Sequence, residues 1–392
     1  MKKILSVLFL GIYVLLLPGC TDLSRENQRF TDVITRVKTK YAPDRRVAVF
    51  DVTFKRTNKV IVVVGEVDNP EARTAVRDAL EPYVKKYIDS VTVLPDPKLG
   101  TLGWGIVRLS VANMRGDPEH SAELVTQAIM GSVVKVLRAH RGWYYVQTSD
   151  KYLGWMEDDS FVQCPKEKAD AWIASRKVIV LATYDFVRQE PSPRSYPVTD
   201  LVAGSLLKNI GSSGAWTKVE LGDGRVGFIP ASNVGDYETW KRNIRPTPEG
   251  VERMARSLLG IPYLWGGTST KAMDCSGFTK TVYLMNGLQL NRDANQQADQ
   301  GLDVTPGEKF ENLRKGDLLF FGRKATTDKP ERISHVAMYL NDRSFIHSSG
   351  YVHMNSLDPS SPIFDAGRLR TFVRARRVIP TSPKLSESVS HQ

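Results

Sequence analysis

The sequence predicts an α+β multidomain protein, and three features indicate this class. Its 392 residues are enough for two to four domains, and 41% of them are hydrophobic, as in an ordinary globular chain. In the middle of the chain, marker residues recur at a constant separation of 73 positions. The parts before and after this repeat mix helical and alternating apolar patterns. We therefore expect a small α/β domain, a duplicated β unit and a C-terminal α+β domain.

The amino terminus has the pattern of an export signal. Two lysines precede an apolar run over residues 4–17, and this run is too short to favour a membrane span. Leu17–Cys20 resembles a bacterial lipobox, which implies a lipoprotein signal peptide over residues 1–20 and a lipid on Cys20. That lipid would tether the chain to a membrane of the cell envelope, facing the periplasm or the exterior. Cleavage and secretion without a lipid is the alternative.

Residues 21–97 are expected to form a small α/β domain. Apolar residues recur at helical spacing after the signal, and two runs rich in valine follow. Asn69 is a good helix cap, and Pro70 suits the first helical position. We assign this domain no activity, and a spacer or partner-binding role is the simplest interpretation. The expected elements are a helix over 23–41, strands over 47–54 and 60–67, a helix from residue 70 and a strand over 91–94.

A β-rich unit occurs twice. Five markers recur after 73 residues, and the short apolar runs between them predict strands of a small barrel that is used twice. The pattern resembles bacterial SH3 domains, which implies two SH3-like β-barrels over residues 105–165 and 176–240. We expect the repeated tryptophans to lie in the barrel cores. The markers are Gly131, Trp143, Gly154, Trp155 and Phe161, which recur as Gly204, Trp216, Gly227, Phe228 and Val234.

The last expected domain, over residues 248–380, contains a cysteine where a loop becomes a helix. An apolar stripe at helical spacing runs from Phe278 to Met285, directly after Cys275. Asp274 is a good N-cap residue. A helix start carries partial positive charge and unpaired N–H groups, which favour a thiolate and hence a nucleophile. A small buried residue near a helix cap is the alternative interpretation of Cys275.

Two histidines lie on one predicted β-hairpin. Strands are expected over residues 333–340 and 344–348, with a turn between them. If position 340 faces position 344, His335 and His347 are diagonal neighbours on the same face. That geometry suits a base, His335, and a second ring that orients it, His347. Either histidine alone is more simply a core residue, but the pair and the helix-capping cysteine together favour catalysis.

These residues resemble the NlpC family of papain-like cell-wall cysteine peptidases. The resemblance implies a papain-like α+β catalytic domain in which Cys275 is the nucleophile, His335 the base and His347 the third member. It also implies that Tyr263 lies beside the thiol near the oxyanion site, although Tyr263 is equally suited to packing. The matching segments are PYLWGG (262–267), DCSGF (274–278), GDLLFF (316–321), SHVAMYL (334–340) and FIHSS (345–349).

The domain order narrows the expected substrate. Two SH3 units before an NlpC-type domain resemble γ-D-glutamyl-L-diamino acid endopeptidases, also called dipeptidyl-peptidase VI. The resemblance implies cleavage after γ-D-glutamate in peptidoglycan stem peptides that have a free amino-terminal L-alanine. Residues 113–131 resemble the segment of the first SH3 domain that recognises this terminus. Another wall amidase, of the N-acetylmuramoyl-L-alanine type, and a non-catalytic wall-binding lipoprotein are the alternatives.

An ammonium group taken out of water needs acceptors and an opposing charge. By the same resemblance, Glu123 supplies a carboxylate and Tyr152 a hydroxyl. Asp274 and Ser276 flank the nucleophile and are candidates to complete the pocket, and Asp293 matches a further position of the cleft. A solvated charge on the surface is the alternative for Glu123.

The charge and the cysteine content limit other functions. The net charge of +11 suits anionic surroundings, such as nucleic acid, acidic lipid or wall polymer. The basic residues are scattered and no nucleic-acid-binding signature occurs, so we expect no nucleic-acid partner. No spacing typical of zinc ligands is present, and we expect neither a metal nor a cofactor. Of the three cysteines, Cys164 is expected to be unpaired. We expect a monomer.

Overall fold

A computed structural model describes residues 18–57 and 60–380, and their side chains from residue 24 onward. Most of the expected signal peptide, and the side chain of Cys20, therefore lie outside the described residues. The chain divides into two compact units, one ending at Leu94 and one beginning at Pro95. Within the described ranges, no helix combines the length and the apolar character that crossing a membrane requires.

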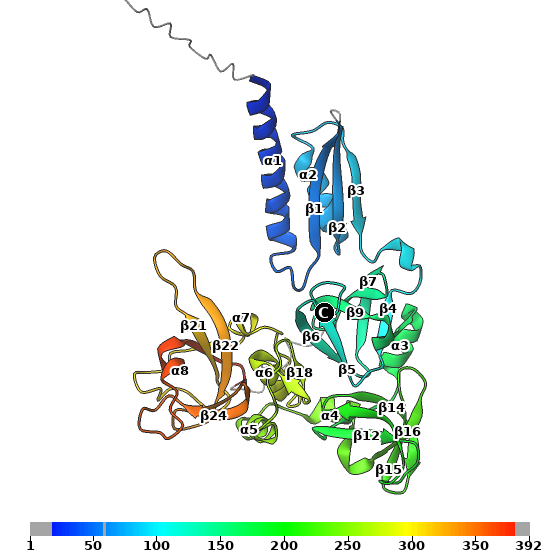
Figure 1. The fold of residues 1–392 in the computed structure, drawn as a ribbon, viewed down its shortest axis with the longest axis vertical. Coiled ribbons are helices and arrows are strands. Elements are labelled where there is room, and N and C mark those ends of the chain that lie inside the picture. Colours follow the sequence, from blue (N-terminus) through cyan, green and yellow to red (C-terminus); the bar gives the residue numbers. More distant parts are fainter. Residues whose placement is uncertain (1–17, 58–59, 381–392) are drawn as a thin grey trace, which may run out of the picture. The chain divides into compact units, whose positions relative to one another are not determined.

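The first unit is a three-stranded sheet with two helices (Figure 1). β1 and β2 are antiparallel, and β3 joins β2 in parallel, as expected when a helix connects two strands. Asn69 caps α2, because its side chain accepts the N–H of Glu71 at 2.8 Å. The elements are α1 (Pro18–Tyr41), β1 (Phe50–Thr57), β2 (Val60–Val67), α2 (Pro70–Leu80) and β3 (Ile88–Val93).

The second unit begins with the duplicated β structure, and the 73-residue offset holds for every strand. The two sheets have the same order, β10-β4-β7-β8-β9-β5-β6 and β17-β11-β14-β15-β16-β12-β13, which confirms two antiparallel SH3-like units. The first contains β4 (Trp104–Val107), β5 (Val111–Arg115), β6 (Leu124–Ile129), β7 (Val133–His140), β8 (Trp143–Gln147), β9 (Leu153–Glu157) and β10 (Phe161–Cys164). The second contains β11 (Lys177–Val180), β12 (Tyr184–Arg188), β13 (Pro197–Val202), β14 (Leu206–Ser213), β15 (Trp216–Glu220), β16 (Val226–Pro230) and β17 (Val234–Asp236).

Of the repeated tryptophans, Trp143 is buried as predicted, with 8% of the residue exposed, but neither Trp143 nor Trp216 belongs to the central apolar cluster of its barrel. Along β8, Tyr144 and Val146 pack into the first core, so Trp143 points to the other face. There it is covered by His120, whose ring centroid lies 5.3 Å from that of Trp143. Trp216 is half-buried and is not part of the second core. Alternation along the strand therefore outweighs the size of the side chain.

The two barrels approach each other closely at a repeated glycine. Gly131 has a φ of 82°, and a Cβ on it would lie 2.0 Å from the carbonyl oxygen of Leu206. The backbone N–H of Leu206 donates to Met130, the residue before the glycine, at 3.0 Å. Only glycine fits this conformation and this contact. α3 (Lys166–Ala174) connects the barrels, and α4 (Tyr237–Asn243) follows the second.

The C-terminal domain packs helices on an antiparallel sheet of order β20-β25-β21-β22-β23-β24. Alternate residues of the central strands face two cores: Phe320 and Val336 pack with α5 and α6, and Phe321 and Ala337 pack on the opposite face. The helices are α5 (Pro248–Ser257), α6 (Cys275–Leu284), α7 (Ala294–Gln297) and α8 (Ala366–Thr371). The strands are β18 (Thr268–Ser269), β19 (Ala272–Met273), β20 (Leu302–Val304), β21 (Leu318–Arg323), β22 (Arg332–Tyr339), β23 (Ser344–Ser349), β24 (Tyr351–Ser356) and β25 (Phe372–Arg377).

Candidate active site

Cys275 is the first residue of α6, as the sequence predicts. Asp274 caps the helix, because its Oδ1 accepts the N–H of Gly277 at 2.7 Å. A Cβ on Gly277 would lie 2.0 Å from the carbonyl oxygen of Gly267, so the glycine lets the helix start press against the preceding loop. The thiol is almost fully buried, with 8% of the residue exposed.

The histidine hairpin has the predicted register. Met338 pairs with Ile346, and the N–H of Leu340 donates to Ser344 at 2.9 Å. The described pairing of β22 with β23 extends over Met338–Ile346 and Tyr339–Phe345, and the backbone N–H of Val336 lowers the pKa of the Cys275 thiol. His335 Nε2 lies 2.7 Å from His347 Nδ1. The structure therefore joins the two predicted histidines and places Cys275 beside Val336, the residue after His335, and the catalytic triad itself stays a prediction.

A chain of hydrogen bonds behind His347 sets the tautomer of the base. His353 Nδ1 donates to the carbonyl of Tyr351 at 2.9 Å, which leaves its Nε2 as an acceptor. The amide nitrogen of Asn355 donates to the carbonyl of Ile363 at 3.2 Å, which turns its oxygen toward His347.

His347 Nε2 therefore has two acceptors in front of it, Asn355 Oδ1 at 2.9 Å and His353 Nε2 at 3.2 Å, and it carries the proton. His347 Nδ1 then accepts from His335 Nε2, and the lone pair of His335 Nδ1 remains for the thiol proton. Two backbone carbonyls thus determine which nitrogen of His335 acts as the base.

Burial keeps the pair neutral at rest. Burial and then the Asp274 carboxylate raise the pKa of the Cys275 thiol to about 11, although the N–H groups of Val336 and Ser276 and the Arg292 cation lower it. Burial and the Arg368 cation hold the pKa of His335 well below 6.5. Burial therefore opposes the thiolate that the start of the helix favours. The proton instead leaves the sulfur for a neutral imidazole as the nucleophile attacks.

Tyr263 stands beside the thiol on the loop before β18. Burial, followed by the neighbouring Cys275 and Asp274, raises the pKa of the Tyr263 hydroxyl to about 12. The hydroxyl therefore stays protonated and is available as a hydrogen-bond donor throughout the physiological range. The N–H of Tyr263 donates to the carbonyl of Gly350 at 2.9 Å, which fixes this loop to the β23–β24 turn.

A buried ion pair supports the helix start from behind. Arg292 is 2% exposed, and its Nη2 lies 2.6 Å from Asp274 Oδ2. Its Nη1 donates to Ser276 Oγ at 2.9 Å, and its Nε donates to Thr126 Oγ1 of the first barrel at 3.1 Å. Burial, the largest single effect, lowers the pKa of Arg292, but Asp274, Asp293 and Tyr152 together raise that pKa on balance.

Asp274 has no lone pair left for a ligand. Besides Arg292, it accepts hydrogen bonds from the N–H of Gly266, the N–H of Gly277 and the hydroxyl of Ser276. This places Asp274 and Ser276 within the site as groups that position Cys275.

The other predicted substrate contacts fall into two separate pairs. Tyr152 donates its hydroxyl to Asp293 Oδ2 at 2.9 Å, across the boundary between the first barrel and the C-terminal domain. Glu123 is exposed, and its Oε1 accepts the indole N–H of Trp265 at 2.8 Å. The first barrel thus contributes to the site at two points, and the ammonium-binding role of these residues stays a prediction.

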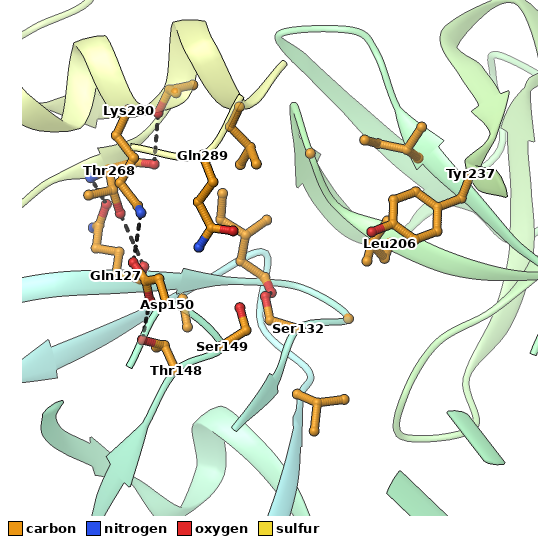
Figure 2. A pocket seen from close by; sticks show the side chains of 18 of the residues that line it. Gln127, Ser132, Thr148, Ser149, Asp150, Leu206, Tyr237, Thr268, Lys280 and Gln289 are labelled. Atoms are coloured by element: carbon orange, nitrogen blue, oxygen red, sulfur yellow. Dashed lines mark hydrogen bonds and ion pairs between the residues drawn. The ribbon is translucent and has the colours of Figure 1, made fainter. Parts of the chain in front are cut away.

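A hydrogen-bonded seam holds the first barrel against the C-terminal domain (Figure 2). Lys280 of α6 pairs with Asp150 at 2.6 Å, two residues before Tyr152. The N–H of Thr268 donates to Gln127 at 2.9 Å. A cavity of about 400 Å³ opens along this seam and continues to the second barrel at Leu206. None of the predicted catalytic side chains lines it.

No cluster of histidine, cysteine, aspartate or glutamate in the described part of the chain is arranged to hold a metal ion. Cys164 and Cys275 are both unpaired, and Cys164 is buried beside Trp172 in the packing of α3 on β4.

Comparison with known proteins places this site in a family. The model of the NlpC/P60 family matches residues 260–370, and that of the bacterial dipeptidyl-peptidase Sh3 domain matches residues 114–161. Dipeptidyl-peptidase 6 of Lysinibacillus sphaericus is 30% identical over 271 residues, which cover 66% of this chain and 93% of that protein. The chain belongs to the NlpC/P60 family. It is a cysteine peptidase of that family.

Two further relatives extend the comparison of this NlpC/P60 peptidase. The γ-D-glutamyl-L-lysine dipeptidyl-peptidase of Bacillus cereus is 28% identical over 270 residues, covering 66% of this chain and 76% of that protein. A crystal structure of an NlpC/P60 family protein from Bacillus cereus superposes with a TM-score of 0.61 and 24% identity. It covers 71% of this chain and all of that one, and it shows that the fold is shared.

Four functional residues escaped the sequence interpretation. His353 faces His347 across the β23–β24 hairpin, and the turn at Gly350 was a signal that a third strand continues the pattern. Asn355 follows on the same face of that strand. Arg292 precedes a residue that was identified, but its partner Asp274 lies 18 positions away. Arg368 lies in a helix that the sequence did not predict.

Proposed function

We propose that this NlpC/P60 enzyme hydrolyses the γ-D-glutamyl–diamino acid bond of peptidoglycan stem peptides that have a free amino-terminal L-alanine. The observation that supports the proposal is the contact of His335 with His347, together with the contact of Tyr152 of the first barrel with Asp293 of the C-terminal domain. The names of the two curated relatives support the choice of a dipeptidyl-peptidase over another wall amidase.

The reaction proceeds in two halves. Cys275 transfers its proton to His335 Nδ1 as the sulfur attacks the γ-carbonyl carbon of D-glutamate. The N–H of Cys275 and the hydroxyl of Tyr263 stabilise the negative oxygen that forms. His335 then returns the proton to the departing amine, and the C–N bond breaks. Water, activated by the same imidazole, hydrolyses the thioester and releases L-Ala-γ-D-Glu.

We propose that the ammonium of L-alanine binds at the face of the first barrel. Glu123 and Asp293 both present carboxylates on residues from this region, whereas the Asp274 carboxylate is saturated by protein donors. When the substrate binds between the Glu123–Trp265 and Tyr152–Asp293 contacts, its ammonium would give up bound water and gain the opposite charge of the carboxylates. A blocked terminus would leave these carboxylates without that partner.

Family membership implies an activity in the cell envelope, outside the cytoplasm. Within the envelope, we propose that Cys20 is lipidated and tethers the enzyme to a membrane. The lipobox-like Leu17–Cys20 supports this. Labelling cells that express the chain with a fatty-acid analogue tests it, since Cys20→Ala should abolish incorporation.

The reaction is tested with purified enzyme and L-Ala-γ-D-Glu-meso-diaminopimelate. We expect two products by mass, L-Ala-γ-D-Glu and the free diamino acid, and no cleavage with Cys275→Ala. The circular dichroism spectrum of that variant should match the wild type. Release of free L-alanine, or cleavage only of muramoyl-linked peptides, would replace the proposed specificity with another amidase activity.

A further inference from the structure

An arginine that the mechanism does not use stands on the histidine side of the site. The guanidinium centre of Arg368, in α8, lies 5.5 Å from the ring centroid of Phe321. That ring lies 5.9 Å from the ring of His335, with which Phe321 pairs across β21 and β22. Nη2 of Arg368 approaches Ser349 Oγ at 3.5 Å, two residues beyond His347.

The electrostatic effects between Arg368 and the titratable groups of the site agree with this position. The Arg368 cation lowers the pKa of both His335 and His347, after the larger effect of burial. In return, Cys275 and Tyr263 act on the pKa of Arg368 itself. The guanidinium therefore shares one electrostatic environment with the thiol, the base and the oxyanion-side tyrosine.

No ion pair within the described residues satisfies Arg368. Burial lowers its pKa, and Asp365 is the acidic residue that opposes this effect most strongly. However, the Asp365 carboxylate caps α8 by accepting the backbone N–H of Arg368 at 2.9 Å. The arginines of the adjacent β25 differ, because each has a carboxylate partner. These pairs are Arg374–Glu331, Arg376–Asp303 and Arg377–Asp317.

A half-buried guanidinium without a counter-ion is suited to an anion that the substrate brings. His335 must reach the departing amine to protonate it, so the diamino acid lies against the histidine side of the site. Its α-carboxylate is separated from that amine by a single carbon atom. An arginine next to His335 is therefore placed for this carboxylate, while the acyl half of the substrate extends toward the first barrel.

We propose that Arg368 binds the free α-carboxylate of the diamino acid, so that the enzyme prefers stem peptides that end at this residue. This inference rests on the proposed function. It implies that a hydrolysis that removes the residues after the diamino acid supplies the preferred substrate. Arg368 acts here as a specificity-determining residue on the leaving-group side.

The test compares two tripeptides that differ in one group, L-Ala-γ-D-Glu-L-Lys as the free acid and as its C-terminal carboxamide. We expect the wild-type enzyme to have a kcat/KM about tenfold or more higher for the acid, as a charge-assisted contact provides. Arg368→Gln should reduce this ratio to about one by lowering the rate on the acid. Arg370→Gln, an exposed arginine of the same helix, should keep the wild-type ratio.

The possible results separate the two proposals. If the wild-type enzyme cleaves neither tripeptide, the proposed function fails and takes this inference with it. If it cleaves both equally, or if Arg368→Gln slows both equally, the reaction stands and the role of Arg368 is overturned. Should Arg368→Gln not fold, the wild-type ratio of acid to carboxamide decides.

Discussion

Arg292 and Asp274 form a buried ion pair of 2.6 Å directly behind the candidate nucleophile. Arg292 also reaches Thr126 of the first barrel, so one guanidinium connects the helix cap to a second domain. An ion pair at this depth is costly to break, because removing one partner leaves a charge without compensation.

Arg292→Met should therefore destabilise the second unit by about 3–5 kcal/mol. Urea unfolding followed by tryptophan fluorescence measures the change. Lys166→Met is the matched control, because its ion pair with Asp170 is largely exposed and should contribute at most about 1 kcal/mol. If both variants lose a similar, small amount of unfolding free energy, the charge of Asp274 is compensated without Arg292.

The chain of hydrogen bonds behind His347 predicts that His353 and Asn355, which have no proposed contact with the substrate, affect kcat. The double variant Asn355→Leu, His353→Leu removes both acceptors of the His347 Nε2 proton. His335 would then lose its fixed tautomer, and kcat should fall about 100-fold with little change in KM. Asn355→Asp, tested with His353→Leu, keeps an acceptor and should restore most of the rate. A fall in the double variant that Asp does not restore would indicate a packing role.

The pH dependence of catalysis follows from the depressed pKa of the base. Because burial and Arg368 hold the pKa of His335 well below 6.5, the imidazole is already neutral in mildly acidic solution. We expect kcat/KM to remain nearly constant from pH 7 down to about pH 5.5. An acidic limb centred at or above pH 6.5 in the wild-type profile contradicts a neutral resting base.

Stability should also depend on pH through His347. Burial lowers its pKa to about 3 in the folded protein, compared with about 6.5 when unfolded. Between these values the unfolded chain binds a proton that the folded chain does not. The stabilising contribution is therefore complete above pH 6.5 and is lost as the pH falls toward 3, by up to about 1.4 kcal/mol per pH unit.

Urea unfolding of the wild type and of His347→Gln at pH 7.0, 5.5 and 4.5 measures this contribution. The difference in stability between the two proteins should shrink as the pH falls. A difference that is constant across this range would mean that His347 titrates normally in the folded state.

Recognition of the amino terminus is tested at Glu123. Glu123→Gln should lower kcat/KM on the free L-alanyl substrate about tenfold or more, and should leave an N-acetylated analogue nearly unchanged. Trp265→Phe is the control, since it removes the indole N–H that contacts Glu123 but keeps the carboxylate. Equal losses on both substrates would remove Glu123 from the recognition site.

The sequence predicted features that depend on local pattern. The cap at Asp274 and the hairpin register that joins His335 to His347 both follow from short-range rules, and the structure confirms both. The sequence did not predict contacts between segments that lie far apart in the chain. Arg292 has no local pattern because its burial depends on Asp274 and Thr126, and the latter lies 166 positions away.

Local rules also could not predict which side chains of a strand face the barrel core, or the charge state of Cys275. Trp143 is large and apolar, but its strand position turns it away from the barrel core. The helix start was expected to favour a thiolate at Cys275, whereas burial, which depends on the whole fold, has the larger effect.

The buried, protonated sulfur of Cys275 has a chemical consequence beyond catalysis. Peroxides and disulfides react with thiolates that they can reach, and Cys275 at rest is neither ionised nor open to solvent. We therefore expect oxidants in solution to react slowly with this sulfur while the site is empty. Its reactivity emerges only while a substrate is in place.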